Sequence, residues 1–369
     1  MAEQRVIRED YRELDRYFLD SGANNIFLVC GKSIKRLPVG RYFAELEARM
    51  GLRLVRFSAF RPNPLYEEAA AAAAAFRSSG CDAIAAVGGG SAMDVAKCVK
   101  LWAGLNPGED YLKQAYVPNQ IPLLAAPTTA GTGSEATHFA VVYRGGEKLS
   151  VAHAACLPSA ALLDPRALET LPDYHRKSSM LDALCHGLES FWSVRAGAES
   201  RSYSRKAVEG VFRHLNGYLR NDPEGNTGML EAAHLAGKAI NLAQTTAGHA
   251  MSYQLTELYG IAHGHAAALC VAELWPHMAA RCGGTALEGI FAELAAAMGC
   301  GSVQEACEKL KNLLVSLGLK APAAAKEDYV VLKRSVNQER LKNNPVFLSL
   351  FDIDDLYHRI LSGKGRENP

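Results

Sequence analysis

The first part of the chain alternates short runs of apolar residues with longer stretches of helical pattern. The runs have the length and composition of buried strands, and they fall at residues 25–30, 53–57, 83–87 and 123–126. A helix is predicted over residues 65–78, where seven consecutive alanines combine high helix propensity with small side chains. Because strands alternate with helices, we expect a parallel sheet connected by crossover helices.

The strand signal fades near residue 170, and amphipathic helical patterns follow almost to the C-terminus. The clearest of them cover residues 198–219, 229–244 and 303–317. We therefore predict an α/β plus all-α fold, with a parallel-sheet domain over residues 1–170 and an all-helical domain over residues 171–369. The residues from Ser362 onward predict a frayed tail.

Composition and charge exclude several classes of partner. Apolar residues make up 49% of the chain, enough for a full core, and 40 Lys and Arg nearly balance 39 Asp and Glu. No global field therefore favours nucleic acid or an anionic membrane surface, and we expect neither as a partner. Any anionic ligand must be bound by local groups.

The nine cysteines are scattered singly and form no CxxC motif, which suits a reducing compartment. The N-terminal residues are charged throughout and lack the pattern of a signal peptide, in which a basic stretch precedes an apolar one. No apolar run approaches the length of a membrane span. We expect a cytoplasmic protein that acts on a small molecule. A homodimer is possible, because the sequence does not determine the oligomeric state.

A glycine-rich loop, Gly88-Gly89-Gly90-Ser91, follows the strand predicted over residues 83–87 and precedes a predicted helix start. Glycines let backbone N–H groups approach a phosphate closely, and a helix N-terminus adds partial positive charge. An ordinary tight turn is the alternative, but it needs only one glycine. The loop departs from GxGxxG, yet it predicts a pyrophosphate site at the carboxyl edge of the sheet.

A second polar loop spans residues 127–135, between an apolar strand and the strand-like residues 136–143. Its four hydroxyl groups and two glycines suit hydrogen bonding to ribose, phosphate or a nicotinamide amide, although a solvated turn is the alternative. Together the two loops predict a dinucleotide cleft.

The first predicted strand ends at Gly31, where an acidic residue would bind the ribose hydroxyls of NAD. None is present, and Lys32, Ser33 and Lys35 could meet a 2′-phosphate. The cofactor prediction therefore leans towards NADP(H) and keeps NAD(H) open, with a merely solvated loop as the alternative.

Asp182 and His186 are four residues apart on a helical pattern, which places a carboxylate and an imidazole on one face. A simple Asp–His hydrogen bond gives the same spacing, so further ligands are needed. His249 can supply one, and His263 or His265 another.

On one unbroken helix, His249 and His263 would lie about 21 Å apart, too far for one ion. The chain must turn between them, and Gly260 is the evident place. One carboxylate with up to three imidazoles suits Fe²⁺ or Zn²⁺ with an open position for a substrate oxygen. Several core or surface histidines without a metal are the alternative.

These residues resemble the iron-containing (group III) alcohol dehydrogenases across nearly the whole chain. The matching motifs are Gly88-Gly89-Gly90-Ser91-x-x-Asp94-x-x-Lys97, Pro127-Thr128-Thr129-Ala130-Gly131-Thr132-Gly133-Ser134-Glu135, Asp182-Ala183-Leu184-x-His186-x-x-Glu189, and His249 followed by His263-Gly264. The resemblance implies a Rossmann-like dinucleotide domain, a helical metal domain of the dehydroquinate synthase type, and an active site in the cleft between them.

The same resemblance implies the roles of individual residues. The implied metal ligands are Asp182, His186, His249 and His263, whereas His265 matches none. The implied cofactor residues are Asn63, Gly89, Gly90, Ser91, Asp94, Thr128, Thr129 and Lys148. The family usually has an acidic residue where Gly31 stands, and members without it tend to use NADP(H).

Two departures from the family pattern bear on mechanism. Many members have a histidine proposed as a proton relay where this chain has Tyr253, and a small residue where it has Met180. A phenol can still donate a hydrogen bond or a proton, so Tyr253 is the candidate catalytic residue.

Within the family, the stretches around His249, His263 and residues 134–139 and 335–346 look like the branch that reduces phosphonoacetaldehyde to 2-hydroxyethylphosphonate. Such a substrate needs cations near its head group. The candidates are His138, Arg340 and Lys342.

The expected function is hydride transfer between a nicotinamide cofactor and a short aldehyde or alcohol, with a divalent metal polarising the carbonyl. A lyase resembling dehydroquinate synthase is one alternative, and it would use three metal ligands and a more basic pocket. A catalytically silent dinucleotide-binding protein is the other.

Overall fold

The computed structural model describes residues 4–362 and divides them into two compact units. The first unit comprises residues up to Leu171 together with Asn221–Leu230, and the second comprises Pro172–Arg220 and the residues from Glu231 onward. The expected frayed tail lies outside the described residues, apart from Ser362, which ends the last helix.

A six-stranded parallel sheet forms the centre of the first unit, in the order β1-β8-β5-β4-β2-β3. Its strands are β1 Arg5–Arg8, β2 Asn25–Cys30, β3 Arg53–Phe57, β4 Ala83–Gly88, β5 Leu123–Pro127 and β8 Ala160–Leu163. The four predicted strands are confirmed within one residue at each end, and the parallel sheet with them. The strand order reverses between β2 and β4, so their carboxyl ends flank the kind of crevice where open α/β sheets bind ligands.

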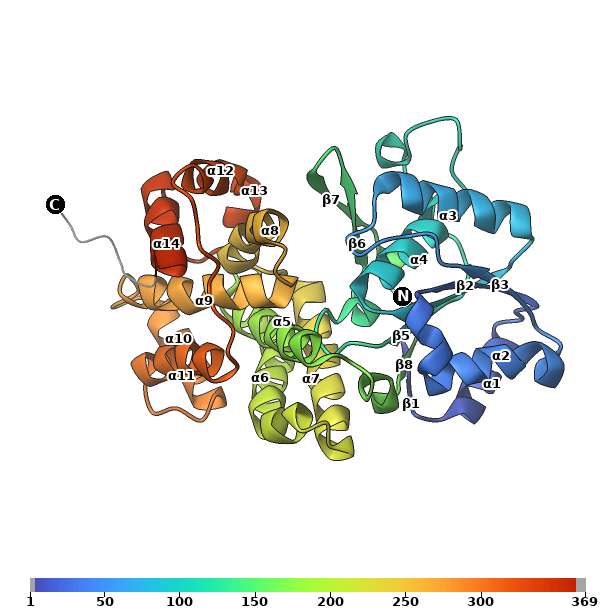
Figure 1. Cartoon of the computed structure of the whole chain (residues 1–369), viewed down its shortest axis with the longest axis horizontal. Coiled ribbons are helices and arrows are strands. Elements are labelled where there is room, and N and C mark those ends of the chain that lie inside the picture. The colour runs from blue at the N-terminus through green and yellow to red at the C-terminus, as the bar shows by residue number, and fades with distance from the viewer. Residues whose placement is uncertain (1–3, 363–369) are drawn as a thin grey trace. The chain divides into compact units, whose positions relative to one another are not determined.

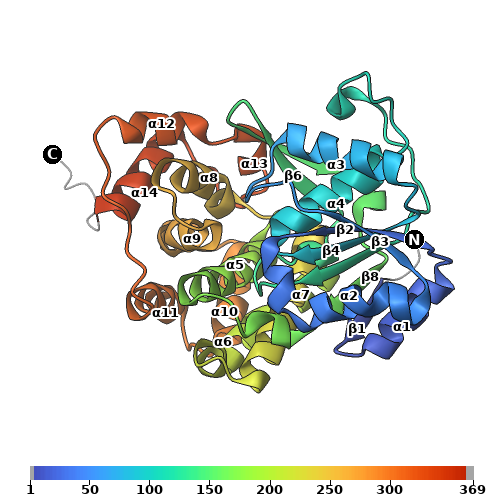
Figure 2. The same ribbon diagram turned by 45° about the vertical axis from the view of Figure 1, so that its right-hand side comes forward.

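Helices cover both faces of this sheet (Figures 1 and 2). Helices α1 Tyr11–Asp20 and α2 Pro38–Met50 lie on one face, and α3 Tyr66–Ser79 and α4 Gly90–Trp102 on the other. Alternate residues of β2 follow this division, because Leu28 packs with α1 and α2 while Phe27 packs with α3 and α4. Both faces of the sheet are therefore apolar, as the continuous apolar runs of the sequence require.

A β-hairpin packs beside α3 and α4. Its strands are β6 Phe139–Arg144 and β7 Glu147–Ala152, joined at Gly145 and Gly146, whose φ angles of 57° and 81° favour glycine. The strand expected from residue 136 begins only at Phe139, because Ser134–Ala136 form a 3₁₀ turn.

The second unit is helical, as the sequence predicts. Its helices are α5 Asp173–Trp192, α6 Ala198–Leu219, the later part of α7 Pro223–Ala243, α8 Ala247–Tyr259, α9 His263–Ala279, α10 Ala286–Ala297, α11 Val303–Ser316, α12 Asp328–Ser335, α13 Gln338–Leu341 and α14 Leu350–Ser362. Helix α5 is buried along most of its length and packs against α6 and α9. Helices α8 and α9 form an antiparallel pair, and the predicted turn at Gly260 is confirmed by its φ of 65°.

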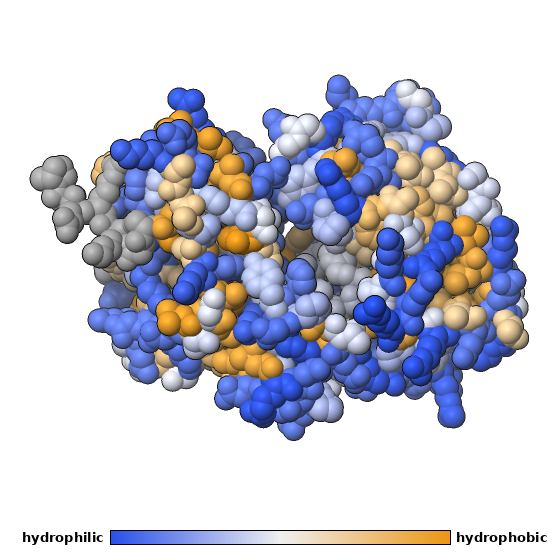
Figure 3. Space-filling view, in the orientation of Figure 1, coloured by the Kyte–Doolittle hydropathy of each residue, from blue (hydrophilic) through white to orange (hydrophobic). Residues whose placement is uncertain are grey.

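The surface in Figure 3 is mainly hydrophilic with scattered apolar groups, in line with the balanced charge of the sequence. Among residues 4–362, no helix combines the length and the apolar character needed to cross a bilayer. Eight of the nine cysteines are buried, and all nine are free thiols.

Candidate active site

The glycine-rich loop lies where the sequence places it, between β4 and α4. Gly89 is the N-cap of α4, so the first backbone N–H groups of this helix face the carboxyl edge of the sheet. A Cβ atom on Gly88 would lie 2.7 Å from Cβ of Ala92, and one on Gly90 would lie 3.1 Å from Cγ2 of Thr132. These glycines are needed for close packing and an open backbone, not for a left-handed conformation.

Residues from three loops meet at this helix start. The backbone N–H of Asn63 donates to Oγ of Ser91 at 3.1 Å, and the N–H of Thr128 donates to the carbonyl of Gly88 at 3.0 Å. Asn63 has a φ of 57°, a left-handed conformation that asparagine tolerates better than most residues. The structure thus brings the sequence-predicted Asn63, Ser91 and Thr128 together around the glycine loop.

The buried ammonium of Lys97 holds the end of the second polar loop in place through hydrogen bonds. Its Nζ donates to the carbonyl and hydroxyl of Ser134 at 2.6 and 2.9 Å, to the hydroxyl of Thr137 at 2.9 Å and to the carbonyl of Phe139 at 2.9 Å. Lys97 is completely buried, and this burial lowers its pKa. Lys97 is part of the glycine-rich motif of the sequence, but the motif by itself does not indicate this role.

Asp94 lies one helical turn before Lys97, as the sequence requires of residues on one helix face. Burial raises the pKa of Asp94 to about 7, although the positive charges of Lys97 and Lys148 lower it. Lys148, on β7, is therefore near Asp94, and two of the predicted cofactor residues share one electrostatic environment.

A cation on the neighbouring strand β3, Arg56, lies beside the end of β2, and the sequence alone did not indicate it. Gly31 follows β2, and its carbonyl accepts a hydrogen bond from Nη2 of Arg56 at 3.0 Å. Nε of Arg56 also donates to Oγ of Ser58 at 3.0 Å. Arg56 is exposed near the end of the neighbouring strand β3, so its proximity to Gly31 follows from strand pairing and not from spacing in the sequence.

Three imidazoles of the second unit converge on one carboxylate oxygen of Asp182. Nε2 of His249 lies 3.6 Å from Oδ1 of Asp182, Nε2 of His186 lies 3.9 Å from it, and Nε2 of His263 lies 4.0 Å from it. Asp182 and His186 come from α5, His249 from α8 and His263 from the first residue of α9. The rings of His186 and His249 stack with centroids 4.6 Å apart.

These separations fit a bound metal ion better than hydrogen bonds. Two ligand atoms that each lie about 2.1 Å from a tetrahedral ion are about 3.4 Å apart, and wider coordination angles increase that separation. Oδ1 of Asp182 and Nε2 of His249 are both buried, and neither has a hydrogen-bond partner. A divalent ion at this point would satisfy both atoms, so the donor set fits Fe²⁺ or Zn²⁺.

Glu189 orients His249 from the side opposite the cluster. One carboxylate oxygen contacts Nδ1 of His249, while the other accepts from the backbone N–H groups of Thr246 and Gly248 at 3.0 and 2.9 Å and from the Thr246 hydroxyl at 2.6 Å. The fully buried carboxylate therefore caps the N-terminus of α8 and directs Nε2 of His249 towards Asp182. The motif of the sequence includes Glu189 without indicating this role, although its position seven residues after Asp182 places both on one helix face.

The carboxylates also set the charge preference of the cluster. Burial lowers the pKa of His249, but the charges of Glu189 and Asp182 raise it to about 9. Burial raises the pKa of Asp182, but the imidazoles, His186 first, hold it well below its ordinary value. The cluster thus favours positive charge.

Two glycines permit the helices to approach the cluster. A Cβ on Gly264 would lie 2.0 Å from the carbonyl oxygen of Ser178 and 2.7 Å from Cβ of Asp182. A Cβ on Gly248 would lie 2.5 Å from Cγ2 of Val271. Any larger residue at Gly264 would push α9 away from α5 and separate His263 from Asp182.

Tyr253 extends the cluster outward from His263. Its ring stacks on the His263 imidazole with centroids 5.4 Å apart and an interplanar angle of 14°. Its hydroxyl accepts a hydrogen bond from Nη1 of Arg340 at 2.7 Å. His265, the alternative to His263 on spacing alone, instead contacts the Tyr174 hydroxyl through Nδ1 at 3.2 Å.

Comparison with known protein families gives a match in each of the two units. Residues 4–165 match the model of the iron-containing alcohol dehydrogenases, and residues 177–361 match the C-terminal model of the Fe-containing alcohol dehydrogenase family. The chain belongs to the iron-containing alcohol dehydrogenase family. The resemblance inferred from the four motifs is confirmed.

Two similar proteins are named as reductases of phosphonoacetaldehyde and of sulfoacetaldehyde. A phosphonoacetaldehyde reductase from Streptomyces viridochromogenes is 38% identical over 221 residues, which cover 56% of this chain and 56% of that protein. A sulfoacetaldehyde reductase from Bifidobacterium kashiwanohense, solved in complex with NAD⁺, is 27% identical with a TM-score of 0.88 and covers 98% of both chains. Long-chain-alcohol dehydrogenase 1 from Geobacillus thermodenitrificans is 29% identical over 362 residues, 93% of this chain and 91% of that protein.

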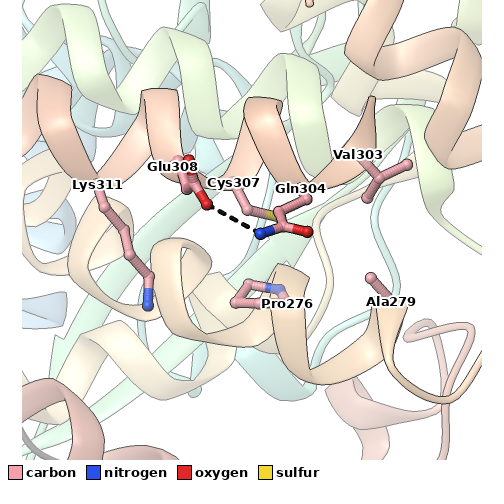
Figure 4. A pocket seen from close by; sticks show the side chains of 7 residues that line it. All are labelled: Pro276, Ala279, Val303, Gln304, Cys307, Glu308 and Lys311. Atoms are coloured by element: carbon pink, nitrogen blue, oxygen red, sulfur yellow. Dashed lines mark hydrogen bonds between the residues drawn. The ribbon is translucent and has the colours of Figure 1, made fainter. Parts of the chain in front are cut away.

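A separate pocket of this family member lies between α9 and α11 (Figure 4). It has a volume of about 350 Å³ and contains none of the predicted site residues. Its lining residues are Pro276, Ala279, Val303, Gln304, Cys307, Glu308 and Lys311. Pro276 lies thirteen residues after His263 on the same helix, about 20 Å along its axis, so this pocket is distinct from the candidate metal centre.

Proposed function

We propose that this member of the iron-containing alcohol dehydrogenases is an NAD(P)H-linked aldehyde reductase and alcohol dehydrogenase. The observation that carries the proposal is the pair of buried, unpartnered atoms, Oδ1 of Asp182 and Nε2 of His249, with two further imidazoles facing the same oxygen. A silent dinucleotide-binding protein would have no reason to keep this pair unsatisfied.

In this proposal Asp182, His186, His249 and His263 hold a divalent Fe²⁺ or Zn²⁺. When bound, the ion polarises the carbonyl of the aldehyde and stabilises the negative charge that develops on its oxygen. Asp182 supplies the negative charge that retains the ion, and Glu189 keeps Nε2 of His249 aimed at it. Asp182, His249 and His263 offer ligand atoms within 4.8 Å of one another, and His186 faces the same carboxylate oxygen at 3.9 Å.

The glycine-rich loop and its neighbours would hold the dinucleotide. Gly88, Gly89 and Gly90 expose the N-terminal N–H groups of α4 to the pyrophosphate, and Thr128, Thr129 and Asn63 border them. When bound, the nicotinamide supplies the hydride. Lys97 keeps the loop of residues 128–137 in one conformation through its four hydrogen bonds.

Tyr253 is proposed to place its hydroxyl beside the substrate oxygen. Arg340 donates to the phenol oxygen, and in this proposal the phenol gives its own proton to the developing alcohol. The variant Tyr253→Phe should lower kcat by about 10- to 100-fold, in line with loss of one positioned proton donor. An unchanged kcat would assign the proton to water alone.

The cofactor is proposed to be NADP(H) in preference to NAD(H). Arg56 is held at Gly31, at the strand end where a 2′-phosphate would lie, and no acidic side chain stands at position 31 to repel it. The variant Arg56→Gln should raise KM for NADPH about tenfold and leave KM for NADH nearly unchanged. Equal changes for both cofactors would contradict the preference.

The substrate is proposed to be a short aldehyde with an anionic head group, such as phosphonoacetaldehyde, and the reaction is placed in the cytoplasm. The free thiols and the two similar reductases support these proposals.

The test is anaerobic purification with Fe²⁺ or Zn²⁺, followed by NADPH and NADH oxidation with neutral, phosphonylated and sulfonylated short aldehydes. We expect turnover with at least one aldehyde, and the matched variant Asp182→Ala should show none. Absence of turnover with every aldehyde and both cofactors, in protein that retains metal, would overturn the proposal.

A further inference from the structure

Three cations of the sequence were candidates for binding an anionic head group, and the structure separates them. Lys342 is highly exposed and forms an ion pair with Glu339, which is equally exposed. His138 belongs to the first unit, where its ring contacts Phe139. Arg340 contacts Tyr253, which stacks on the candidate metal ligand His263 within the second unit.

The attachment is a continuous series of contacts. Tyr253 stacks in parallel on the His263 imidazole, and the Arg340 guanidinium both donates to the Tyr253 hydroxyl and lies 5.0 Å from the centroid of its ring. A cation is therefore connected to a candidate metal ligand through one intervening side chain, Tyr253.

His263, the ligand that Tyr253 stacks on, is also the most accessible member of the cluster. The His263 side chain is 33% exposed, whereas the side chains of Asp182, His186 and His249 are 8% exposed or less. A substrate that reaches the candidate metal centre from solvent therefore meets His263, with Tyr253 and Arg340 beside it.

The backbone around Arg340 is fixed at both ends. Asn337 caps α13, and its side-chain oxygen accepts from the N–H groups of Glu339 and Arg340 at 2.9 and 3.4 Å. Asn343, which is buried, donates to the carbonyls of Ala243 and Thr245 at 2.9 Å each. Arg340 thus extends from an anchored segment, which reduces the conformational entropy that ligand binding would otherwise cost.

We propose that Arg340 is the specificity-determining residue that binds the tetrahedral oxyanion of an aldehyde bearing a phosphonate or sulfonate. The inference rests on the proposed aldehyde reductase function. In such a substrate a single methylene separates the carbonyl from the head group, so an aldehyde bound at the cluster would keep its oxyanion close to His263 and its neighbours Tyr253 and Arg340. A guanidinium matches it well, because its planar N–H groups can bind two oxygens of one oxyanion.

The experiment compares anionic and neutral aldehydes of similar size. The variants are Arg340→Gln, Arg340→Lys and, as the matched control on the same segment, Lys342→Gln. For each protein, kcat and KM are measured with phosphonoacetaldehyde, sulfoacetaldehyde and propanal. We expect Arg340→Gln to lower the ratio of kcat/KM for the anionic aldehydes to that for propanal by about 30-fold, mainly through KM. Arg340→Lys should restore part of this ratio, and Lys342→Gln should leave it unchanged.

A second measurement does not depend on turnover. Dissociation constants for 2-hydroxyethylphosphonate, 2-hydroxyethanesulfonate and 1-propanol are obtained by calorimetry on metal-loaded protein. Arg340→Gln should weaken binding of the two anions by about 10- to 100-fold relative to 1-propanol.

Two results would overturn the inference while the proposed function stands. One is a wild-type enzyme that prefers propanal, and the other is an Arg340→Gln variant in which anionic and neutral ligands are affected equally, which indicates a structural role only. Loss of turnover with all aldehydes in the wild type would instead contradict the proposed function, and the calorimetry would then still test Arg340.

Discussion

Each of the two units contains a buried charged group, but only the one in the first unit has its hydrogen bonds completed by the protein. In the first unit the ammonium of Lys97 is surrounded by four oxygen atoms of one loop and the nearby Asp94, so the protein itself completes its shell. In the second unit the carboxylate of Asp182 faces three imidazoles, yet its Oδ1 and Nε2 of His249 are left without partners.

The difference separates a structural charge from a binding site. A buried ion whose hydrogen bonds are complete holds a loop in one conformation, and nothing further is needed. A buried pair that the fold leaves incomplete requires a ligand, and its surroundings show which one. Asp182 and Glu189 together favour positive charge at the centre, which suits a divalent cation.

The largest effect should come from removing the carboxylate on which the incomplete cluster is built. Asp182→Ala should abolish metal retention and lower kcat/KM by at least about 1,000-fold, because the charge stabilisation supplied by a bound ion is worth several kcal/mol. Metal content by mass spectrometry and steady-state kinetics check this. Asp173→Asn, an exposed carboxylate on the same helix, is the control. Retention of a full equivalent of metal would place the ion elsewhere.

Substitution of Lys97, whose hydrogen bonds are complete, should affect stability and cofactor binding rather than metal binding. Lys97→Met leaves two carbonyls and two hydroxyls without their donor and should lower the free energy of unfolding of the first unit by about 3 kcal/mol. KM for the dinucleotide should rise, while metal content stays the same. Chemical denaturation and cofactor titration measure both, with Lys100→Met, a buried lysine one turn away, as control. Loss of metal together with the loop would show that the two clusters depend on each other.

A smaller effect should follow from loosening the incomplete cluster without removing a ligand. Glu189→Gln keeps an acceptor for the N-terminus of α8 but loses the charge that orients His249. Metal affinity should fall about 10- to 100-fold, the usual range for such supporting carboxylates. Competition with a fluorescent chelator measures it, and Glu199→Gln, exposed on α6, is the comparison. An affinity equal to that of the wild type would contradict the role given to Glu189.

The smallest effect concerns pH and the carboxylate beside Lys97. The pKa of Asp94 is raised to about 7 in the folded protein, above its ordinary value of 3.8. The folded state therefore holds a proton that the unfolded state has lost, so this contribution to stability is complete below pH 3.8 and disappears as pH rises to about 7. Asp94→Asn should flatten the fall of Tm between pH 5 and 8 by a few degrees. An unaltered profile would mean that Asp94 stays ionised throughout.

The sequence predicted strands β2, β3, β4 and β5 of the first unit well but missed β1 at one edge of the sheet. The strands at Asn25–Cys30 and Arg53–Phe57 are continuous apolar or alternating runs, and they were predicted to the residue. Strand β1 was missed because its four residues include two arginines, and it becomes a strand only by pairing with β8, more than 150 residues away. Helix α7 begins at Pro223, six residues before the predicted start, because Pro and two Gly conceal its first turns.

The candidate site shows the same limit. The spacing of Asp182 and His186 is visible on one helix, but the choice between His263 and His265 depends on where α9 begins and on how it packs against α5. Arg56 reaches Gly31 only because β2 and β3 are neighbours. Local patterns thus predicted which residues have suitable chemistry, and long-range pairing decided which of them meet.

The reversal at Gly260 also bears on the order in which the cluster can form during folding. His249 and His263 are fourteen residues apart and are joined by a helical hairpin, whereas Asp182 lies sixty-seven residues before His249. Closing the longer loop costs about 1.4 kcal/mol more chain entropy than closing the shorter one. We therefore expect the two histidines to meet through local contacts before α5 adds the carboxylate of Asp182 to the site.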